Sequence, residues 1–357
     1  MTAYTWIGGT GDWNLAGNWS PSSPAGPPKA TDTATINATG TAYTVTIDTA
    51  DVAASLTENS SSATVDDAGS LTLTGTFTLS AGTFILGSGG TLSGGTTKLT
   101  GGTFVCAGGT LSGVTYDGTL DLSEYGASVH LASGTVVNNA NGTAGGTIND
   151  TGEYGSLHFD NTQTFNNATI NLGNTSGYTS FLYGDDLTGA GTVLTLGLGA
   201  TINESGSAQI QASSYAGDGI VDKGKISQTA SDSTLYIIGN SFTNSGTITA
   251  ASSGGTLAIE PTTFTNSGTL AISNGDSVTI DATNFSNTGS ITLASGSSLY
   301  LGGSFTLAGL GKVTNSGGTV YLEGTLDNTG GTLNGSGSLG QAVLRRCSMA
   351  ARSRAAQ

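Results

Sequence analysis

The C-terminal half of the chain contains a repeat of 21 residues. One column of glycines and two columns of apolar residues recur at this spacing, each four times in succession. These columns are Gly254, Gly275, Gly296 and Gly317; Leu257, Val278, Leu299 and Val320; and Ile259, Ile280, Leu301 and Leu322. A fixed period of this length is typical of a repeat architecture, in which each unit buries its apolar face against the next unit. The repeat therefore predicts a stack of similar coils.

Each coil is expected to contain more than one strand. Leu257 and Ile259 are two positions apart, and residues at this separation on a strand point to the same face. A second strand is indicated by recurring phenylalanines, the first three of which precede Asn-Ser-Gly or Asn-Thr-Gly. The phenylalanines are Phe242, Phe264, Phe285 and Phe305, and the asparagines are Asn244, Asn266 and Asn287. Asparagine and glycine favour tight turns, and stacked asparagines can pair their side-chain amides from coil to coil.

The pattern extends toward the N-terminus, where Gly82-Thr83-Phe84 recurs as Gly102-Thr103-Phe104. No stretch keeps the apolar period of 3.6 residues that marks an amphipathic helix. We therefore predict an all-β protein, a right-handed parallel β-helix (solenoid) with about 21 residues per coil and about 14 coils over residues 45–340. A β-sandwich with coincidental spacing is the competing interpretation.

Residues 1–44 differ in composition from the rest and are predicted to form an N-terminal cap. They contain all three tryptophans of the chain, Trp6, Trp13 and Trp19, and four of its five prolines. A solenoid exposes apolar side chains and open strand edges at each end, and large aromatic rings can cover them. A tryptophan platform that stacks on sugars is the alternative.

Residues 341–357 break with the repeat. The segment holds all four arginines of the chain, Arg345, Arg346, Arg352 and Arg354. We expect an atypical basic tail that is disordered or read out of frame, as in a fragment of a gene. A genuine basic tail that docks or targets the protein is the alternative.

The charge of the chain restricts its partners. Up to residue 344 there are 24 acidic residues and five lysines, a net charge of −19. Such a surface repels phosphate backbones and anionic membranes, so nucleic acid is excluded as a partner and direct membrane insertion is not expected. The two cysteines, Cys106 and Cys347, are far apart and form no CxxC motif. We accordingly predict no cofactor and no metal site.

The N-terminal segment carries a family resemblance. The motif Trp-Ile-Gly-Gly-Thr-Gly-Asp-Trp-Asn-Leu-Ala-Gly-Asn-Trp at residues 6–19, together with Gly-Thr-Leu and Asn-Ser-Gly-Thr repeats in the body, resembles bacterial autotransporter passengers and related haemagglutinin-like surface proteins. The resemblance implies a secreted or surface-anchored β-helix that acts as an adhesin or stalk. It further implies an extracellular or cell-surface location, associated with the outer membrane through other parts, and glycans or a cell-surface protein as partners.

Catalysis is not expected, although a carbohydrate-active β-helix enzyme, a polysaccharide hydrolase or lyase, is the alternative because fold alone does not exclude it. The two histidines, His130 and His158, share no recognisable nucleophile motif, and no arginine precedes Arg345 to hold a uronate carboxylate. The carboxylate pairs Asp66-Asp67 and Asp185-Asp186 are adjacent in sequence, so each pair is predicted to point to opposite faces of a strand.

Aromatic residues are densest between residues 150 and 190. Tyrosines beside carboxylates suit a sugar-binding groove, because the rings stack on sugars and the oxygens accept hydrogen bonds from hydroxyls. The predicted ligand-binding residues are Tyr154, Tyr178, Tyr183, Asp185 and Asp186. An inserted loop that packs its own aromatic residues is the alternative.

Overall fold

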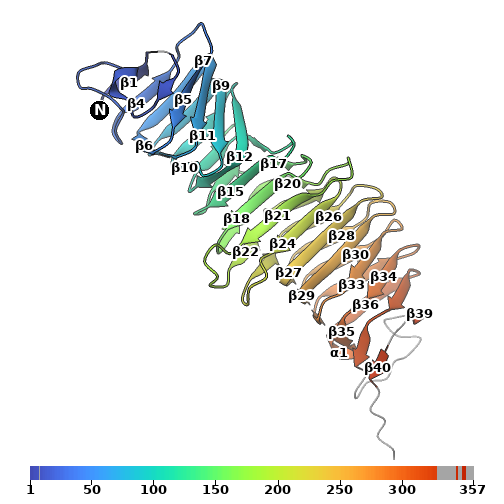
Figure 1. Ribbon diagram of the computed structural model, residues 1–357. Helices are drawn as coiled ribbons and strands as arrows, with labels where there is room; N and C mark the ends of the chain where they lie inside the picture. Colours follow the sequence, from blue (N-terminus) through green and yellow to red (C-terminus); the bar gives the residue numbers. More distant parts are fainter. Residues whose placement is uncertain (8, 328–342, 345–347, 351–357) are drawn as a thin grey trace, which may run out of the picture. The chain divides into compact units, whose positions relative to one another are not determined.

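A computed structural model describes residues 1–7, 9–327, 343–344 and 348–350 of the chain. Strands account for 59% of the residues and helix for 2%, and the strands form a β-solenoid of about 13 turns with parallel sheets (Figure 1). The prediction of an all-β parallel β-helix is confirmed, with about 22 residues per turn in place of 21. The chain divides into two compact units, Met1–Ile170 and Asn171–Gln357.

The first unit begins with a short antiparallel pairing that buries the three tryptophans. Trp19 meets Trp6 and Trp13 edge-on, with ring centroids 5.1 and 4.8 Å apart. The three rings are at most 1% exposed, which leaves none of them open to stack on a sugar. The elements of this segment are β1 (Ala3–Trp6), β2 (Gly11–Asp12), η1 (Ala16–Asn18), β3 (Trp19–Ser20) and β4 (Thr33–Ile36).

The rest of the first unit is built from parallel strands that stack equivalent residues. Phe84 pairs in register with Phe104 on the next turn, and their rings stack with centroids 5.3 Å apart. The strands are β5 (Tyr43–Ile47), β6 (Ala50–Ala53), β7 (Ser55–Asp67), β8 (Ser70–Leu73), β9 (Thr76–Gly87), β10 (Thr91–Ser93), β11 (Thr96–Leu99), β12 (Thr103–Ser112), β13 (Thr115–Asp117), β14 (Thr119–Asp121), β15 (Ser128–Ala132), β16 (Val136–Asn138), β17 (Gly146–Asp150), β18 (Ser156–Asp160) and β19 (Gln163–Phe165); β20 (Ala168–Leu172) includes the boundary between the units.

The second unit repeats this arrangement with greater regularity. Its elements are β21 (Ser180–Asp185), β22 (Val193–Leu196), β23 (Thr201–Glu204), β24 (Ala208–Ala212), β25 (Gly219–Asp222), β26 (Lys225–Gln228), β27 (Thr234–Asn244), β28 (Thr247–Ala250), β29 (Thr256–Asn266), β30 (Thr269–Ile272), β31 (Ser277–Ile280), β32 (Asn284–Asn287), β33 (Ser290–Ala294), β34 (Ser298–Leu301), β35 (Ser304–Thr306), α1 (Leu307–Leu310), β36 (Lys312–Ser316), β37 (Thr319–Leu322), β38 (Thr325–Asp327), β39 (Val343–Leu344) and β40 (Ser348–Ala350).

The predicted apolar columns form the core of the second unit. Strands β29, β31, β34 and β37 pair in parallel and place Leu257, Val278, Leu299 and Val320 in one register. All four side chains are fully buried. Ile280 lies between Ile259 and Leu301, as the 21-residue period predicts. The predicted stacking of the Leu257 column and the predicted position of Ile280 are therefore both confirmed.

A ladder of asparagine side chains runs along one corner of the same coils. Asn244 Nδ2 donates to Asn266 Oδ1 at 2.7 Å, and Asn266 Nδ2 donates to Asn287 Oδ1 at 2.7 Å. Asn287 Nδ2 then donates to the carbonyl of Leu310 in α1 at 2.8 Å. The three asparagines are at most 2% exposed. The coil-to-coil pairing predicted for them is confirmed, and each amide satisfies its neighbour inside the protein.

Asp222 occupies the ladder position one turn earlier. It pairs in register with Asn244, and Asp222 Oδ1 accepts from the Gly224 amide at 2.9 Å. Asn244 Oδ1 accepts from the Gly246 amide in the same way. Among the described residues, the other oxygen of Asp222 has no hydrogen-bond partner. Burial raises the pKa of this carboxyl from 3.8 to about 6, against the opposing hydrogen bond from Gly224.

Part of the predicted tail lies outside the described residues. This holds for 341–342, 345–347 and 351–357. Within the tail, the backbone of β39 pairs with β37, and that of β40 pairs with β38. The prediction that residues 341–357 are disordered or out of frame stays a prediction.

We predict that Asn266→Ala destabilises the protein. The substitution removes the acceptor of one Asn244 N–H, while the Asn244 amide keeps its bond to the Thr269 carbonyl, and it removes the donor to Asn287 Oδ1. Each lost bond inside the protein costs about 1–3 kcal/mol. Urea unfolding followed by circular dichroism should show this loss. The control Thr265→Ala changes the half-buried neighbour on the same strand and should shift the transition by far less; equal shifts would contradict the role of the ladder.

A second substitution, Asp222→Asn, should stabilise the protein in a pH-dependent way. Because the folded pKa of Asp222 is raised, its carboxyl favours folding below about pH 4, and this contribution is lost as the pH rises through about 6. The amide stays neutral and extends the ladder. The free energy of unfolding should be measured for both proteins at pH 4 and pH 7.5. The advantage of the variant over the wild type should be larger at pH 7.5 by roughly 1–3 kcal/mol. A pH-independent difference would contradict this explanation.

Candidate functional site

The five predicted ligand-binding residues belong to two different units. Tyr154 lies in the first unit just after β17, where its backbone has a φ of 58°. Its ring is 45% exposed and meets Tyr125 edge-on, with centroids 5.8 Å apart. The remaining four, Tyr178, Tyr183, Asp185 and Asp186, lie in the second unit, in and around β21.

Two of these residues share the outward face of β21. Its side chains alternate between buried and half-buried, and Tyr183 and Asp185 belong to the half-buried set. Phe181 completes this set and stacks on Tyr183, with ring centroids 5.5 Å apart and planes 9° from parallel. Tyr178 precedes the strand and is 44% exposed.

Neighbouring strands of the second unit extend this outward face. Gln209 and Gln211 on β24 pair in register with Phe181 and Tyr183 on β21. Gln209 Nε2 donates to Gln211 Oε1 at 2.7 Å. Tyr236 on β27 is in register with Gln209 and is 42% exposed. We call these five side chains the aromatic–glutamine face.

The aromatic–glutamine face combines flat rings with carboxamide groups on a rigid sheet. Rings of this kind stack on the apolar faces of sugars, and carboxamides both donate to and accept from hydroxyl groups. Sequence reasoning identified Tyr183 and counted Phe181 in the same dense aromatic segment, but it missed Gln209, Gln211 and Tyr236. The signal that could have found them is the alternation in Ser-Phe-Leu-Tyr-Gly-Asp, Ala-Gln-Ile-Gln-Ala and Thr-Leu-Tyr-Ile-Ile, once the three segments are aligned as stacked strands.

Asp186 has a local role in the loop that follows β21. Its carboxylate accepts hydrogen bonds from the amides of Thr188, Gly189 and Gly191 at 2.9, 2.7 and 2.9 Å. The Thr188 hydroxyl donates to it as well. Desolvation works against the charged form, but these hydrogen bonds hold the pKa of Asp186 below its usual range. The side chain therefore stays ionised and organises the loop.

The pair Asp66-Asp67 does not form a carboxylate dyad. Asp67 is fully buried, whereas Asp66 is half-buried on the opposite face of β7. Burial raises the pKa of Asp67 to about 7. Two carboxyls on opposite faces of one strand cannot act together on one bond.

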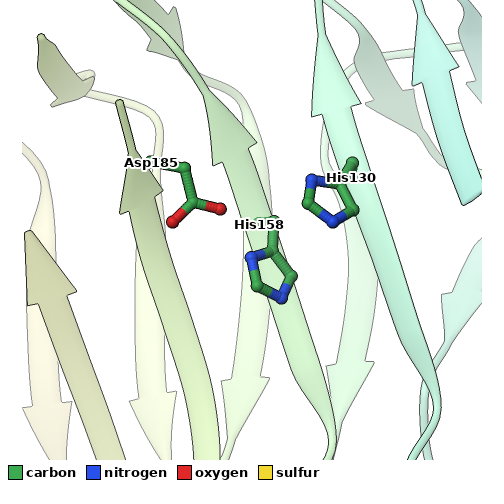
Figure 2. A group of neighbouring side chains, drawn as sticks. All are labelled: His130, His158 and Asp185. Atoms are coloured by element: carbon green, nitrogen blue, oxygen red, sulfur yellow. The ribbon is translucent and has the colours of Figure 1, made fainter. Parts of the chain in front are cut away.

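The two histidines lie side by side in the first unit (Figure 2). His130 on β15 pairs in register with His158 on β18, and their rings stack with centroids 4.3 Å apart and planes 14° from parallel. His130 Nδ1 also lies 2.7 Å from Asp160 Oδ1 at the end of β18. Figure 2 additionally labels Asp185, which belongs to the second unit. Sequence reasoning did not bring the two histidines together.

No protein family model matches the chain, and neither a curated protein nor a solved structure matches it. The resemblance to autotransporter passengers therefore stays a prediction. Within the described part of the chain, no helix is long and apolar enough to cross a membrane.

We predict that Asp186→Ala loosens the loop after β21 without unfolding the coils. Hydrogen exchange at the amides of Thr188, Gly189 and Gly191 should accelerate, because each loses its acceptor. Leu187→Ala is the matched control, since Leu187 is 63% exposed in the same loop. Unchanged exchange in the Asp186 variant would show that the carboxylate does not organise the loop.

Proposed function

We propose that this chain is a non-enzymatic β-helix of a bacterial surface protein, an adhesin or an autotransporter-passenger-like stalk, located outside the cell or on its surface. The observation that carries the proposal is the in-register stacking of equivalent side chains over successive turns. Examples are the column that contains Leu257 and the ladder from Asn244 to Asn287. A coil that is bonded to both neighbours through strands and side chains makes a stiff element, as a stalk requires.

The charge of the chain fits the same role. Only 9% of the residues are charged, yet the net charge is −15. Chains that carry a charge of one sign repel each other, which limits association between neighbouring copies. A stalk at high local density needs this property in addition to stiffness.

The aromatic–glutamine face supports a contact with host or environmental glycans. Tyr183 and Tyr236 lie two turns apart, and the strand that carries Gln209 and Gln211 lies between them. Such a face offers stacking surfaces and hydrogen-bonding groups without a nucleophile. A cell-surface protein is the alternative partner.

A carbohydrate-active enzyme is the second candidate function, and Asp185 is the observation that favours it. Its carboxylate shares the outward face of β21 with Tyr183. Glycoside hydrolysis normally needs a second carboxyl, roughly 5–10 Å away. On β21 itself the outward face provides no second acid, because its other members are Phe181 and Tyr183.

A panel of neutral and acidic polysaccharides tests the proposal. We expect binding without new reducing ends or unsaturated uronates. Tyr183→Ala and Tyr236→Ala should each weaken binding about 2- to 12-fold, the effect of losing about 0.5–1.5 kcal/mol of ring contact. Tyr300→Ala is the matched control, because Tyr300 lies on a strand without glutamine neighbours and stacks on Tyr321.

The opposite result would favour the enzyme. Release of new chain ends that Asp185→Asn abolishes would show that the carboxylate takes part in catalysis. Binding that Tyr183→Ala and Tyr236→Ala leave unchanged would exclude the aromatic–glutamine face as the glycan contact.

A further inference from the structure

The two histidines of the chain form a stacked imidazole pair on the outer face of the first unit. They are separated by 28 positions in sequence but pair directly because β15 and β18 stack in register. The His130 side chain is 27% exposed, so the pair can be reached from solvent. We infer that His130 and His158 bind a divalent transition-metal ion, with Zn²⁺ and Cu²⁺ as the class of ligand.

The carboxylate of Asp160 prepares His130 for this role. It lies 2.7 Å from His130 Nδ1, and Asp160 is only 7% exposed. A proton on Nδ1 donates to this carboxylate, and in that tautomer the lone pair of the neutral ring lies on Nε2, the nitrogen that would bind the metal ion. Histidine ligands of metals characteristically donate their second ring N–H to a carboxylate in this way, and the contact also raises the basicity of the ligand.

The spacing of the rings is close to what a shared ion requires. One ring nitrogen of His130 and one of His158 lie within 4.8 Å of each other. Two nitrogens that each bind zinc at about 2.0–2.1 Å in tetrahedral geometry are about 3.3 Å apart. Because the rings are stacked only 14° from parallel, their in-plane lone pairs run nearly side by side, so both side chains have to rotate before they converge on one ion. Water can fill the remaining coordination positions.

The imidazole nitrogens of the pair determine which metal ions it favours. Imidazole nitrogen favours zinc, copper and nickel, whereas calcium and magnesium favour oxygen ligands. The net charge of −15 adds a general attraction for cations, which concentrates them near the surface. The sequence predicted no metal site because the cysteines form no CxxC motif, and the 28-residue step between the histidines, which departs from the 21-residue repeat, did not reveal that they pair.

The test is a titration of the chelator-treated full chain with Zn²⁺ by calorimetry, at about 0.15 M salt and with excess Mg²⁺ to occupy diffuse acidic sites. We expect one zinc site. His130→Gln and His158→Gln should each weaken it at least tenfold. Thr110→Ala is the matched control, because Thr110 pairs in register with His130 on β12 and offers no imidazole. Thermal melting of the metal-free variants checks that they fold.

A Cu²⁺ titration followed by electron paramagnetic resonance identifies the ligands directly. The wild type should show nitrogen hyperfine coupling that both histidine variants reduce. Asp160→Asn tests the positioning role of the carboxylate. It should weaken zinc binding about 10- to 100-fold and change the tautomer of metal-free His130, read from its ¹⁵N chemical shifts.

Two results would overturn the inference. One is zinc binding of equal strength in the double variant His130→Gln/His158→Gln, which would assign the ion to the acidic surface. The other is the absence of zinc binding by the folded wild type once Mg²⁺ is in excess.

Discussion

The parallel pairing of each coil with the next is the interaction on which the rest of the structure depends. In-register parallel strands place each side chain directly beside its equivalent one turn away, about 4.8 Å distant. Apolar side chains then form continuous columns, as at Leu257 and Val278, and amides form a ladder, as at Asn244 and Asn266. A residue type that can bond to itself is favoured at every stacked position. Examples are the stacked phenylalanines Phe242, Phe264 and Phe285 and the paired amides of Asn244 and Asn266.

The same geometry makes charge costly. Like charges on adjacent strands repel each other, and no solvent separates them inside a coil. In agreement with this cost, only 9% of the residues are charged. Asp222 is an example of a carboxyl group at a stacked, buried position. It occupies an asparagine position beside Asn244, and burial raises its pKa toward neutrality.

The regular part of the fold could be predicted because its strands and loops keep one length. The columns through Ile280 follow directly from a 21-residue step, and the ladder through Asn266 from steps of 22 and 21 residues. The sequence identified Tyr183 as a candidate, but the residues that the fold brings beside it, and the pairing of the two histidines, could not be predicted, because loops of other lengths precede their strands. His130 and His158 are 28 residues apart, and so are Phe181 and Gln209, yet both pairs are in register. Strand pairing keeps the two residues of each pair in register, whereas loops of different length change their separation in the sequence. A search for one fixed period therefore does not find such contacts.

Outward positions are where a solenoid can vary without disturbing its core. On β21 the buried Leu182 takes part in the stack, whereas Phe181 and Tyr183 on either side face outward. On β15 the same holds for the buried Val129 and Leu131 around His130. Because each coil contacts only its neighbours, a change at one outward position affects the adjacent turns and little else. The stiffness of the coils is what holds each set of side chains, the histidine pair in the first unit and the aromatic–glutamine face in the second, in its register.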